Sequence, residues 1–397
     1  MSRIDNTGRL PSMTRGPSAR GDNLLAPARE RSSVIDRLEC IITRDLGGRG
    51  LAADPQDNLV TRCRGNLARA ARHMAYEGSA VAIVTGFHVA AAERPTIETD
   101  GPCGAVALGW LLARIGFEVV LVTDPLGAEA LSAAMRAARL EPPSVTIQVF
   151  PFENESPTSL ERCSNLPEHS AQSQLYAESF FRSPLGGRLT HLVAVERAGP
   201  GFGTHVDRLQ EPGFAERSPV GPRHDGRVHN FRGMDITPLT AKTHLLFDFV
   251  RDNHLPIRTI GIGDGGNEIG MGSIPRAVLK ANIPGNLGEL ITCRVATDWT
   301  IACGVSNWGA YALGTAVAWH RGLGGVLGEW TDAREQAVLE ALVERGAVDG
   351  VTGKADLSVD GMPLIQHLEI WAQIREAVAE RNSHASLPQP PPPGQAR

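Results

Sequence analysis

Gly261-Ile-Gly-Asp-Gly-Gly-Asn-Glu-Ile-Gly-Met-Gly272 is the stretch around which the rest of the chain is arranged. It overlaps the end of a β-branched run, 257–262, that has the composition of a short buried strand. Six glycines among these twelve residues permit positive φ angles and let the backbone approach a ligand closely. The pattern therefore predicts a strand that ends in a tight turn.

The acidic residues of this turn indicate what it binds. Its first glycines fit the G-x-G-x-x-G spacing of dinucleotide sites. However, Asp264 and Glu268 would place negative charge where a pyrophosphate needs N–H groups and a positive helix end. Two carboxylates with the Asn267 carboxamide suit an ammonium group, a metal ion or proton transfer. The alternative is a tight strand-to-helix turn without a ligand.

The composition limits the class of protein. The 397 residues are 42% hydrophobic and 21% charged, as expected for a globular protein. A net charge of -5 gives no reason to expect a nucleic-acid or membrane partner. The six cysteines show no C-x-x-C pair or metal-ligand spacing, and no apolar run reaches the ~18 residues of a membrane helix. We expect a cytoplasmic protein.

Apolar strand-like segments alternate with helical segments along the chain. Strands are predicted at 80–85, 118–124, 145–150, 190–196, 257–262, 290–295 and 300–303. Helices are predicted at 33–42, 57–76, 100–115, 128–140, 173–181, 239–253, 275–283, 306–319, 333–344 and 363–380. This alternation predicts an α/β fold: a mostly parallel sheet with helices on both faces, in a Rossmann-like three-layer arrangement.

The segments outside this pattern set the domain boundaries. Residues 1–30 and the proline-rich end 383–397 are predicted to be disordered tails. Residues 31–382 are predicted to form a single domain. Within it, the irregular segment 198–238 is too long for a simple connector, so we expect it to lie over the site as a lid or binding loop.

Polar residues from distant parts of the chain follow the predicted strands. Ligands of parallel sheets bind beyond the carboxyl ends of the strands. Just past such ends lie Gly86 with the Thr99-Asp100 turn, Asp124, Glu196-Arg197 and Gly263-Asp264. These residues are therefore predicted to meet at one edge of the sheet and to form an enzyme-like site.

Several motifs together resemble the D-glutamate cyclase C-terminal domain family over about residues 35–325. They are Thr85-Gly-Phe87, Glu98-Thr-Asp-Gly-Pro102 with Gly104-Ala-Val-Ala-Leu108, Glu196-Arg-Ala-Gly199, the Gly261–Gly272 stretch and Gly304-Val-Ser-Asn-Trp-Gly309. The resemblance implies a carbon–oxygen hydro-lyase that converts D-glutamate to 5-oxo-D-proline with loss of water. It also implies a mitochondrial-matrix location if the source is eukaryotic. The mammalian member carries an additional N-terminal hydro-lyase-like domain, for which this chain has no room.

The chemistry of ring closure assigns roles to the polar residues. The α-amine must lose its proton, and the attacked carboxyl must be polarised. The predicted catalytic carboxylates are Asp264, Glu268, Glu196 and Asp100. Arg197 is predicted to bind a substrate carboxylate in bidentate fashion. The other predicted substrate-binding residues are Asn267, Gly263, Gly265, Gly266, Thr99 and Asn307. No cofactor is certain; a divalent metal, Mg or Mn, would be held by Asp264, Glu196 and Asp100.

Each of these residues has a structural alternative. Asp100 can cap the helix that follows it, and Asn307 can be the N-cap of its own helix. Glu196 can form a local ion pair with Arg197. Asp298 fits a turn residue better than a catalytic one.

Two other function classes remain open on sequence grounds. The chain can be a non-catalytic module that binds an acidic amino acid and supports a separate hydro-lyase. A nucleotide-dependent enzyme is the third hypothesis. Both the lyase and the binding-module hypotheses predict a small acidic amino acid as the partner. The sequence is also compatible with a homo-oligomer.

Overall fold

The computed structural model describes residues 28–90, 92, 94–140, 145–152, 171–202, 224, 226–285 and 287–379. The predicted C-terminal tail, residues 1–27 of the predicted N-terminal tail and most of the segment 198–238 lie outside these residues, whereas residues 28–30 begin a helix.

A parallel sheet of six strands forms the centre of the molecule. The strand order is β5-β4-β1-β6-β7-β8, and every neighbouring pair is parallel. The strands are β1 (Ala80–Thr85), β4 (Glu118–Thr123), β5 (Val145–Val149), β6 (His191–Val195), β7 (Arg258–Gly263) and β8 (Trp299–Ala302). This is the doubly wound order, which reverses between β1 and β6. Ligand crevices of such sheets open at that reversal, beyond the strand ends.

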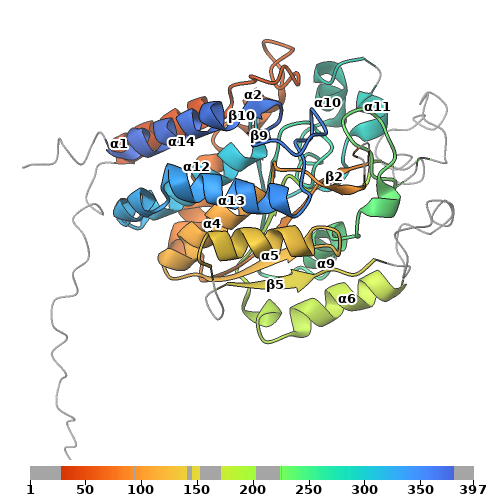
Figure 1. Ribbon diagram of the computed structural model, residues 1–397, viewed down its shortest axis with the longest axis horizontal. Coiled ribbons are helices and arrows are strands. Elements are labelled where there is room, and N and C mark those ends of the chain that lie inside the picture. Colours follow the sequence, from red (N-terminus) through yellow and green to blue (C-terminus); the bar gives the residue numbers. More distant parts are fainter. Residues whose placement is uncertain are drawn as a thin grey trace, which may run out of the picture.

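Helices cover both faces of the sheet, which confirms the predicted class. Along β1, Val81 and Ile83 pack into one hydrophobic cluster, whereas Ala82 and Val84 pack into the cluster on the opposite face. The first face carries α3 (Asn66–Glu77), α4 (Pro102–Arg114), α5 (Ala128–Ala137), α12 (Ser306–His320) and α13 (Asp332–Glu344). The second carries α2 (Leu59–Cys63), α6 (Ala171–Arg182), α9 (His244–Asp252), α10 (Arg276–Asn282) and α11 (Gly288–Ile291). In Figure 1, β5 lies between α5 and α6.

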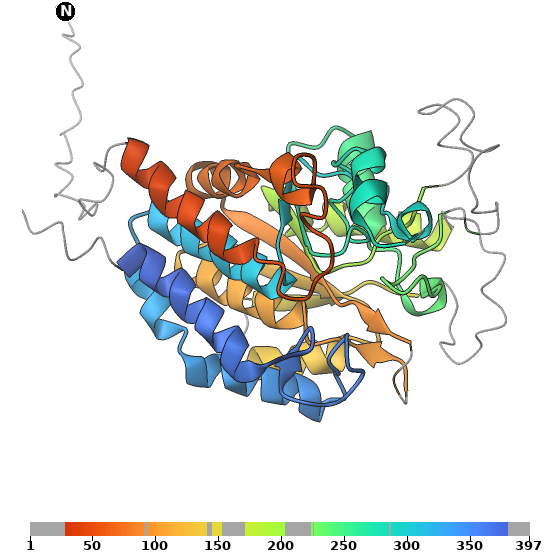
Figure 2. The same cartoon turned by 90° about the horizontal axis from the view of Figure 1, so that it is seen from above.

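The two ends of the described chain come together. Helices α1 (Ala28–Ile42) and α14 (Leu364–Ala379) are in contact. Figure 2 shows them as the red and blue helices on the same side of the molecule. Two short hairpins complete the fold: β2 (His88–Val89) with β3 (Thr96–Ile97), and β9 (Ser358–Val359) with β10 (Met362–Pro363). The β2–β3 hairpin begins directly after the carboxyl end of β1. Thr99, which follows β3, donates a hydrogen bond through its Oγ1 to the Ser358 carbonyl of β9. Both hairpins therefore lie close to the carboxyl edge of the sheet.

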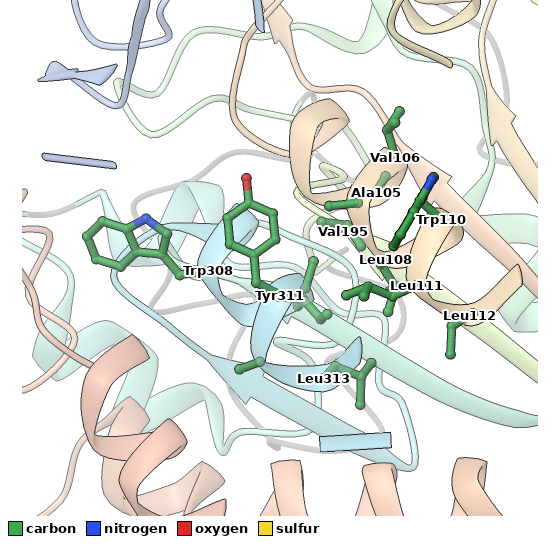
Figure 3. Packing of buried hydrophobic residues seen from close by; sticks show 14 of the residues in the cluster. Ala105, Val106, Leu108, Trp110, Leu111, Leu112, Val195, Trp308, Tyr311 and Leu313 are labelled. Atoms are coloured by element: carbon green, nitrogen blue, oxygen red, sulfur yellow. The ribbon is translucent and has the colours of Figure 1, made fainter. Parts of the chain in front are cut away.

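Helices α4 and α12 pack against each other in the centre of the first face. Both are almost fully buried along their length, so their apolar residues extend around the helix instead of forming one stripe. Figure 3 shows Trp308 and Tyr311 projecting from α12 and Trp110 from α4. This pair fixes where the N-termini of the two helices meet the strand ends.

The glycine-rich stretch folds back onto its own strand. A Cβ at Gly261 would lie 2.4 Å from the Ile269 carbonyl oxygen, and Gly270 has a φ of +110° and packs against Gly261. Only glycine allows this contact between two backbones. The chain returns across the end of β7, and the next helix begins only at Arg276. The stretch is therefore a turn that packs on its own strand and does not lead directly into a helix.

Three predicted elements are wrong in detail. Residues 290–295 do not form a strand; α11 covers the beginning of this segment, and single bridges cover the rest. The predicted helix at 57–76 is broken at Gly65, which takes a left-handed φ of +76°. The helix predicted at 239–253 begins only at His244, after the 3₁₀ turn Thr237–Leu239. In each segment the apolar spacing is real, but local turn geometry decides where the element begins and ends.

Among the described residues, no helix is both long and apolar enough to span a lipid bilayer.

Candidate active site

The N-termini of α4 and α12 meet at the edge of the sheet and cap each other. The Asp100 carboxylate accepts hydrogen bonds from the backbone N–H groups of Ser306 and Asn307, at 2.9 and 2.8 Å. In return, Asn307 Oδ1 accepts from the N–H groups of Gly101 and Gly104, at 2.9 and 2.6 Å. Each residue therefore caps the helix of the other, and both positive helix ends point at the same place.

The approach of α4 to the end of β6 depends on Gly101. Its φ is +91°, and a Cβ there would lie 2.7 Å from Glu196 Cβ. A side chain at this position would separate α4 from the end of β6. The glycine therefore brings the Asp100 turn against the residue that follows the neighbouring strand.

Glu196 takes a strained backbone conformation directly after β6. Its φ is +42°, in the left-handed region that non-glycine residues rarely occupy. Ser306 Oγ donates a 2.5 Å hydrogen bond to Glu196 Oε2. Such strain is typical of functional sites, where the surrounding structure holds one side chain in a required direction. Here it turns the carboxylate toward Asp100.

Asp264 completes a set of three buried carboxylates. One ligand atom from each of Asp100, Glu196 and Asp264 can be chosen so that all lie within 4.8 Å of one another. Among the residues that the structure describes, neither carboxylate oxygen of Asp264 has a hydrogen-bond partner, although the residue is only 1% exposed. A buried carboxylate without partners is energetically unfavourable unless a proton or a cation neutralises it. The set is therefore built to receive a positive charge.

Two residues that the sequence reasoning missed, Arg49 and Asp360, also belong to the site. Arg49 Nη1 lies 3.3 Å from Asp264 Oδ1, and its Nη2 donates to Asp360 Oδ1 at 2.5 Å. Asp360 precedes β10, has a φ of +54°, and its Oδ2 has no hydrogen-bond partner. Neither residue follows a strand of the main sheet, so the rule of polar residues after strand ends could not find them.

The proximity of the carboxyls changes their acidity. Burial and the neighbouring Asp360 raise the pKa of Asp100 to about 8. Burial and the Glu268 charge raise the pKa of Glu196 well above its usual value. Burial outweighs the opposing Arg49 charge at Asp264, whose pKa is also raised well above its usual value. At neutral pH this group of acids therefore holds protons or a cation.

Glu98 is a further buried acid at the site. It is 7% exposed, and burial together with the charges of Asp360 and Asp100 raises its pKa well above the usual value. It sits where the β2–β3 hairpin returns toward the sheet, and its backbone N–H donates to the Phe87 carbonyl. Glu98 belongs to the motif that contains Asp100, but its own role gave no signal in the sequence.

A small cavity is lined by two of these acids, Glu98 and Glu196. Its volume is about 230 Å³, room for roughly seven or eight water molecules. Residues 230–232, which belong to the described part of the long segment 198–238, form part of its wall. The polar and aromatic side chains of residues lining the cavity include those of Arg49, Glu98, Glu196, Asn230, Phe231, Arg232 and Asn267. A cavity of this size and polarity suits a small charged molecule.

The Glu268 carboxylate accepts hydrogen bonds from the backbone N–H groups of the turn glycines. Glu268 Oε1 accepts from the N–H of Gly265 at 2.7 Å, and its Oε2 accepts from the N–H of Gly266 at 2.8 Å. A Cβ at Gly263 would lie 2.8 Å from Glu268 Oε2. These groups were predicted to act as a catalytic base and as substrate-binding donors. The geometry instead makes Glu268 the internal anchor of the turn that presents Asp264.

Arg197 does not fit the predicted role of binding a substrate carboxylate. Its side chain is fully buried and donates to the Asp124 carboxylate, to Thr243 Oγ1 and to the carbonyls of Gly86 and Ala241. The ion pair with Glu196 that the sequence left open is not formed. Arg197 therefore ties together the ends of β1, β4 and β6. Burial alone would raise the pKa of Asp124, but its contacts with His88 and Arg197 outweigh this effect and lower it.

Three further predicted residues have structural contacts. Thr99 is fully buried, and its Oγ1 holds the β9–β10 hairpin through Ser358. Asn307 caps α4, as described above. Asn267 Nδ2 donates to the His229 carbonyl, while Asn267 also lines the cavity. Asp298 accepts from the backbone N–H and the hydroxyl of Thr259, in agreement with its interpretation as a turn residue.

Comparisons with known proteins identify a family that matches most of the chain. The family model described as D-glutamate cyclase-like, C-terminal, matches residues 38–207 and 215–375. The chain is 31% identical over 357 residues to the protein named D-glutamate cyclase, mitochondrial, from Homo sapiens. The alignment covers 84% of this chain and 50% of the human protein, so the chain spans about half the length of that relative.

Proposed function

The chain belongs to the D-glutamate cyclase-like, C-terminal family, and from this membership we propose that it is a lyase that converts D-glutamate to 5-oxo-D-proline. The observation that carries the proposal is the set of buried carboxyls formed by Asp100, Glu196 and Asp264, of which Glu196 lines a cavity of about 230 Å³. Within the described part of the chain, Asp264 has no hydrogen-bond partner. An ammonium group is the part of glutamate that such a site would attract.

The reaction requires a balanced transfer of protons. The amine nitrogen forms a bond to the side-chain carboxyl carbon, and one C–O bond of that carboxyl breaks. The ammonium group gives up two protons, and both leave with the oxygen as water. A group that accepts a proton from the ammonium and returns it to the leaving oxygen would accelerate both steps.

Glu98 and Glu196 are the acids best placed for this proton transfer. Both line the cavity, and burial raises the pKa of each well above its usual value. A carboxylate with a raised pKa is a stronger base and can take a proton from an ammonium group more readily. Glu196 is additionally oriented by Ser306.

The residues also fit a divalent cation. Asp100, Glu196 and Asp264 offer three carboxylate oxygens, and the oxygens of Asp264 have no hydrogen-bond partner. Oxygen-only ligands are preferred by Mg²⁺ and Mn²⁺. When bound, such an ion would polarise the attacked carboxyl as a Lewis acid. The capping bonds from Ser306 and Asn307 would hold Asp100 in place for it.

The remaining cavity residues would bind the substrate's carboxylates. Arg49 and Arg232 line the cavity together with Asn230. This reassigns to Arg49 the role that was predicted for Arg197. The carboxylates in the wall oppose the phosphates of a nucleotide, and the volume is below the roughly 300–1,000 Å³ of typical cofactor pockets, which argues against a nucleotide-dependent reaction.

The test is direct turnover. Purified protein is incubated with D-glutamate or L-glutamate, with Mg²⁺, with Mn²⁺ or with a chelator, and 5-oxoproline is measured by chiral chromatography. We expect metal-dependent formation of the D-product. Absence of the product under all conditions would refute the lyase proposal.

A second candidate follows from the chain's length relative to its human relative. Because the chain spans half of that protein, the domain can instead bind an acidic amino acid and support a separate hydro-lyase. Thermal stabilisation by D-glutamate without any 5-oxoproline would favour this binding module.

A further inference from the structure

Arg49 is held on a rigid loop that presents it to the acids. The Asp45 carboxylate accepts hydrogen bonds from the backbone N–H groups of Arg49, Gly50 and Leu51, at 2.8, 2.9 and 3.1 Å. Gly50 has a φ of +88°, and a Cβ there would lie 2.4 Å from the Asn282 carbonyl oxygen. The backbone of this loop is therefore fixed, and movement at Arg49 is confined to its side chain.

The two ends of the Arg49 guanidinium have unequal contacts. Nη2 forms the shorter pair, 2.5 Å from Asp360, whereas Nη1 is 3.3 Å from Asp264 and makes no hydrogen bond to it. The Phe231 ring lies beside the guanidinium, with its centroid 5.6 Å from Arg49 Cζ. One end is thus anchored, and the other is held by charge attraction alone.

The anchor itself is well supported. Asp349 Oδ2 accepts from Ser358 Oγ and from the N–H of Gly361, both at 2.7 Å, and so fixes the hairpin that carries Asp360. The left-handed φ of Asp360 shows that this hairpin holds the carboxylate against a local conformational preference.

We propose that Arg49 is an exchangeable counter-ion: it neutralises Asp264 until a divalent cation occupies that carboxylate, and it then binds the substrate carboxylate that does not react. A guanidinium and a divalent cation compete for Asp264, because both require its negative charge. Asp360 retains Nη2 throughout, so Nη1 alone changes partner. The identity of the carboxylate rests on the proposed function, whereas the competition with metal does not.

The exchange couples the binding of metal to that of substrate. Metal releases Nη1 from Asp264, and the released donor then points into a cavity that Arg49 already lines. By thermodynamic linkage, metal must increase the affinity for a dicarboxylate as much as the dicarboxylate increases the affinity for metal. Such a coupling disappears if the residue that changes partner is removed.

The test uses Mn²⁺ alone and glutarate, a dicarboxylate that has no amine and cannot cyclise. Titration calorimetry and Mn²⁺ electron paramagnetic resonance measure both affinities in the wild type and in Arg49→Met. We expect Arg49→Met to bind Mn²⁺ about tenfold more tightly, within the usual range of coupling between two sites. We also expect it to lose glutarate binding and the effect of Mn²⁺ on it.

Two further variants keep the test decisive. Arg62→Met removes an exposed arginine whose ion-pair partner within the described part of the chain is Asp57, and it should leave both affinities unchanged. Arg49→Lys keeps the charge but cannot span two carboxylates; it should bind Mn²⁺ like the wild type and glutarate weakly, and it replaces Arg49→Met if that variant does not fold.

Unchanged or weaker Mn²⁺ binding in Arg49→Met would overturn the proposal, as would glutarate binding that is independent of Mn²⁺ in the wild type. None of these measurements requires turnover. Their failure is therefore distinguishable from a failure to form 5-oxoproline.

Discussion

Two buried polar clusters lie one turn apart on α12 and have opposite characters. At its N-terminus, Ser306 and Asn307 contact Glu196 and Asp100 in a site where Asp264 has no hydrogen-bond partner. One turn later, Tyr311 enters a second cluster with Glu335 and His367, in which the polar side-chain atoms are paired. Both clusters are fully buried, so burial alone does not separate a site from a structural network.

The second cluster connects three helices. Tyr311 donates to Glu335 Oε1 at 2.5 Å, and Trp330 donates to Glu335 Oε2 at 2.7 Å. Trp308 donates to His367 Nδ1 at 3.1 Å, and this defines His367 Nε2 as the protonated nitrogen of the neutral ring. Burial and the Glu335 charge raise the pKa of Tyr311 well above its usual value, so its hydroxyl remains a donor.

The difference lies in the balance of donors and acceptors. Around Glu335, each carboxylate oxygen faces a neutral donor, and the network joins α12, α13 and α14. Around Asp264, acceptors outnumber donors, and Arg49 is the cation that pairs with it. A polar cluster whose donors and acceptors balance stabilises the fold, whereas one with more carboxylates than cationic partners is ready to bind a further cation.

The largest expected effect is that of Asp264→Asn. Loss of this carboxylate should lower 5-oxoproline formation by about 10²–10⁴-fold, the usual range for a group that takes part in the chemistry. It should change the free energy of unfolding little, because the carboxylate has no hydrogen-bond partner among the described residues and Arg49 keeps its ion pair with Asp360.

Turnover and urea unfolding measure the two effects. Asp298→Asn, at a turn carboxylate bonded to Thr259, is the matched control and should retain full turnover. A strongly destabilised Asp264→Asn variant with normal activity would contradict this assignment, because it would make the Asp264 cluster structural and not catalytic.

Tyr311→Phe should have the opposite outcome. The variant leaves Glu335 Oε1 without its hydroxyl donor, and we expect the free energy of unfolding to fall by about 1–3 kcal/mol. Mn²⁺ affinity should remain unchanged, because the hydroxyl contacts Glu335 and His367 and none of the three clustered acids. Chemical denaturation and metal titration on the same sample would check this, and altered metal affinity would contradict it.

The pH dependence of the metal-free protein should report the acid cluster. The folded-state pKa of Asp100 is raised from its usual value to about 8, so folding favours the protonated form. Its contribution to stability is therefore present below about pH 4 and is lost as the pH rises toward 8.

The melting temperature without metal should accordingly fall between pH 5 and 8, and the increase caused by Mn²⁺ should grow over the same interval. Scanning fluorimetry at several pH values with and without Mn²⁺ measures both trends. A stabilisation by Mn²⁺ that shrinks with rising pH would show that protons and metal do not compete at this site.

Asn307→Ala should give the smallest change. It removes the cap of α4, which typically contributes about 1 kcal/mol to stability. Since Asp100 keeps its bond to the backbone N–H at position 307, turnover should fall much less than in Asp264→Asn. The two variants compared under saturating Mn²⁺ would test this order, and equal losses of turnover would contradict it.

The layered α/β class could be predicted from the sequence because strands such as 80–85 and 118–123 are runs of consecutive apolar residues, and such a run can be recognised without knowing its contacts. The position of Glu196 and Asp264 after their strands was equally local, and a parallel sheet necessarily brings such ends to one edge. The strand predicted at 290–295 failed because a short apolar run does not distinguish a strand from a turn of helix.

The chain by itself indicated three of the carboxyls that meet: Asp100, Glu196 and Asp264 each follow a strand or open a helix. Only the tertiary structure decided their partners. Asp100 caps the helix that begins near Asn307, and Asn307 caps the helix that begins near Asp100. Arg197 pairs with Asp124 and not with a site acid. The cation that contacts Asp264 is Arg49, which lies more than two hundred residues earlier in the chain. Hydrogen bonds and ion pairs depend on distances of a few ångströms between segments that are remote in sequence. These distances cannot be predicted from the spacing of residues along the chain.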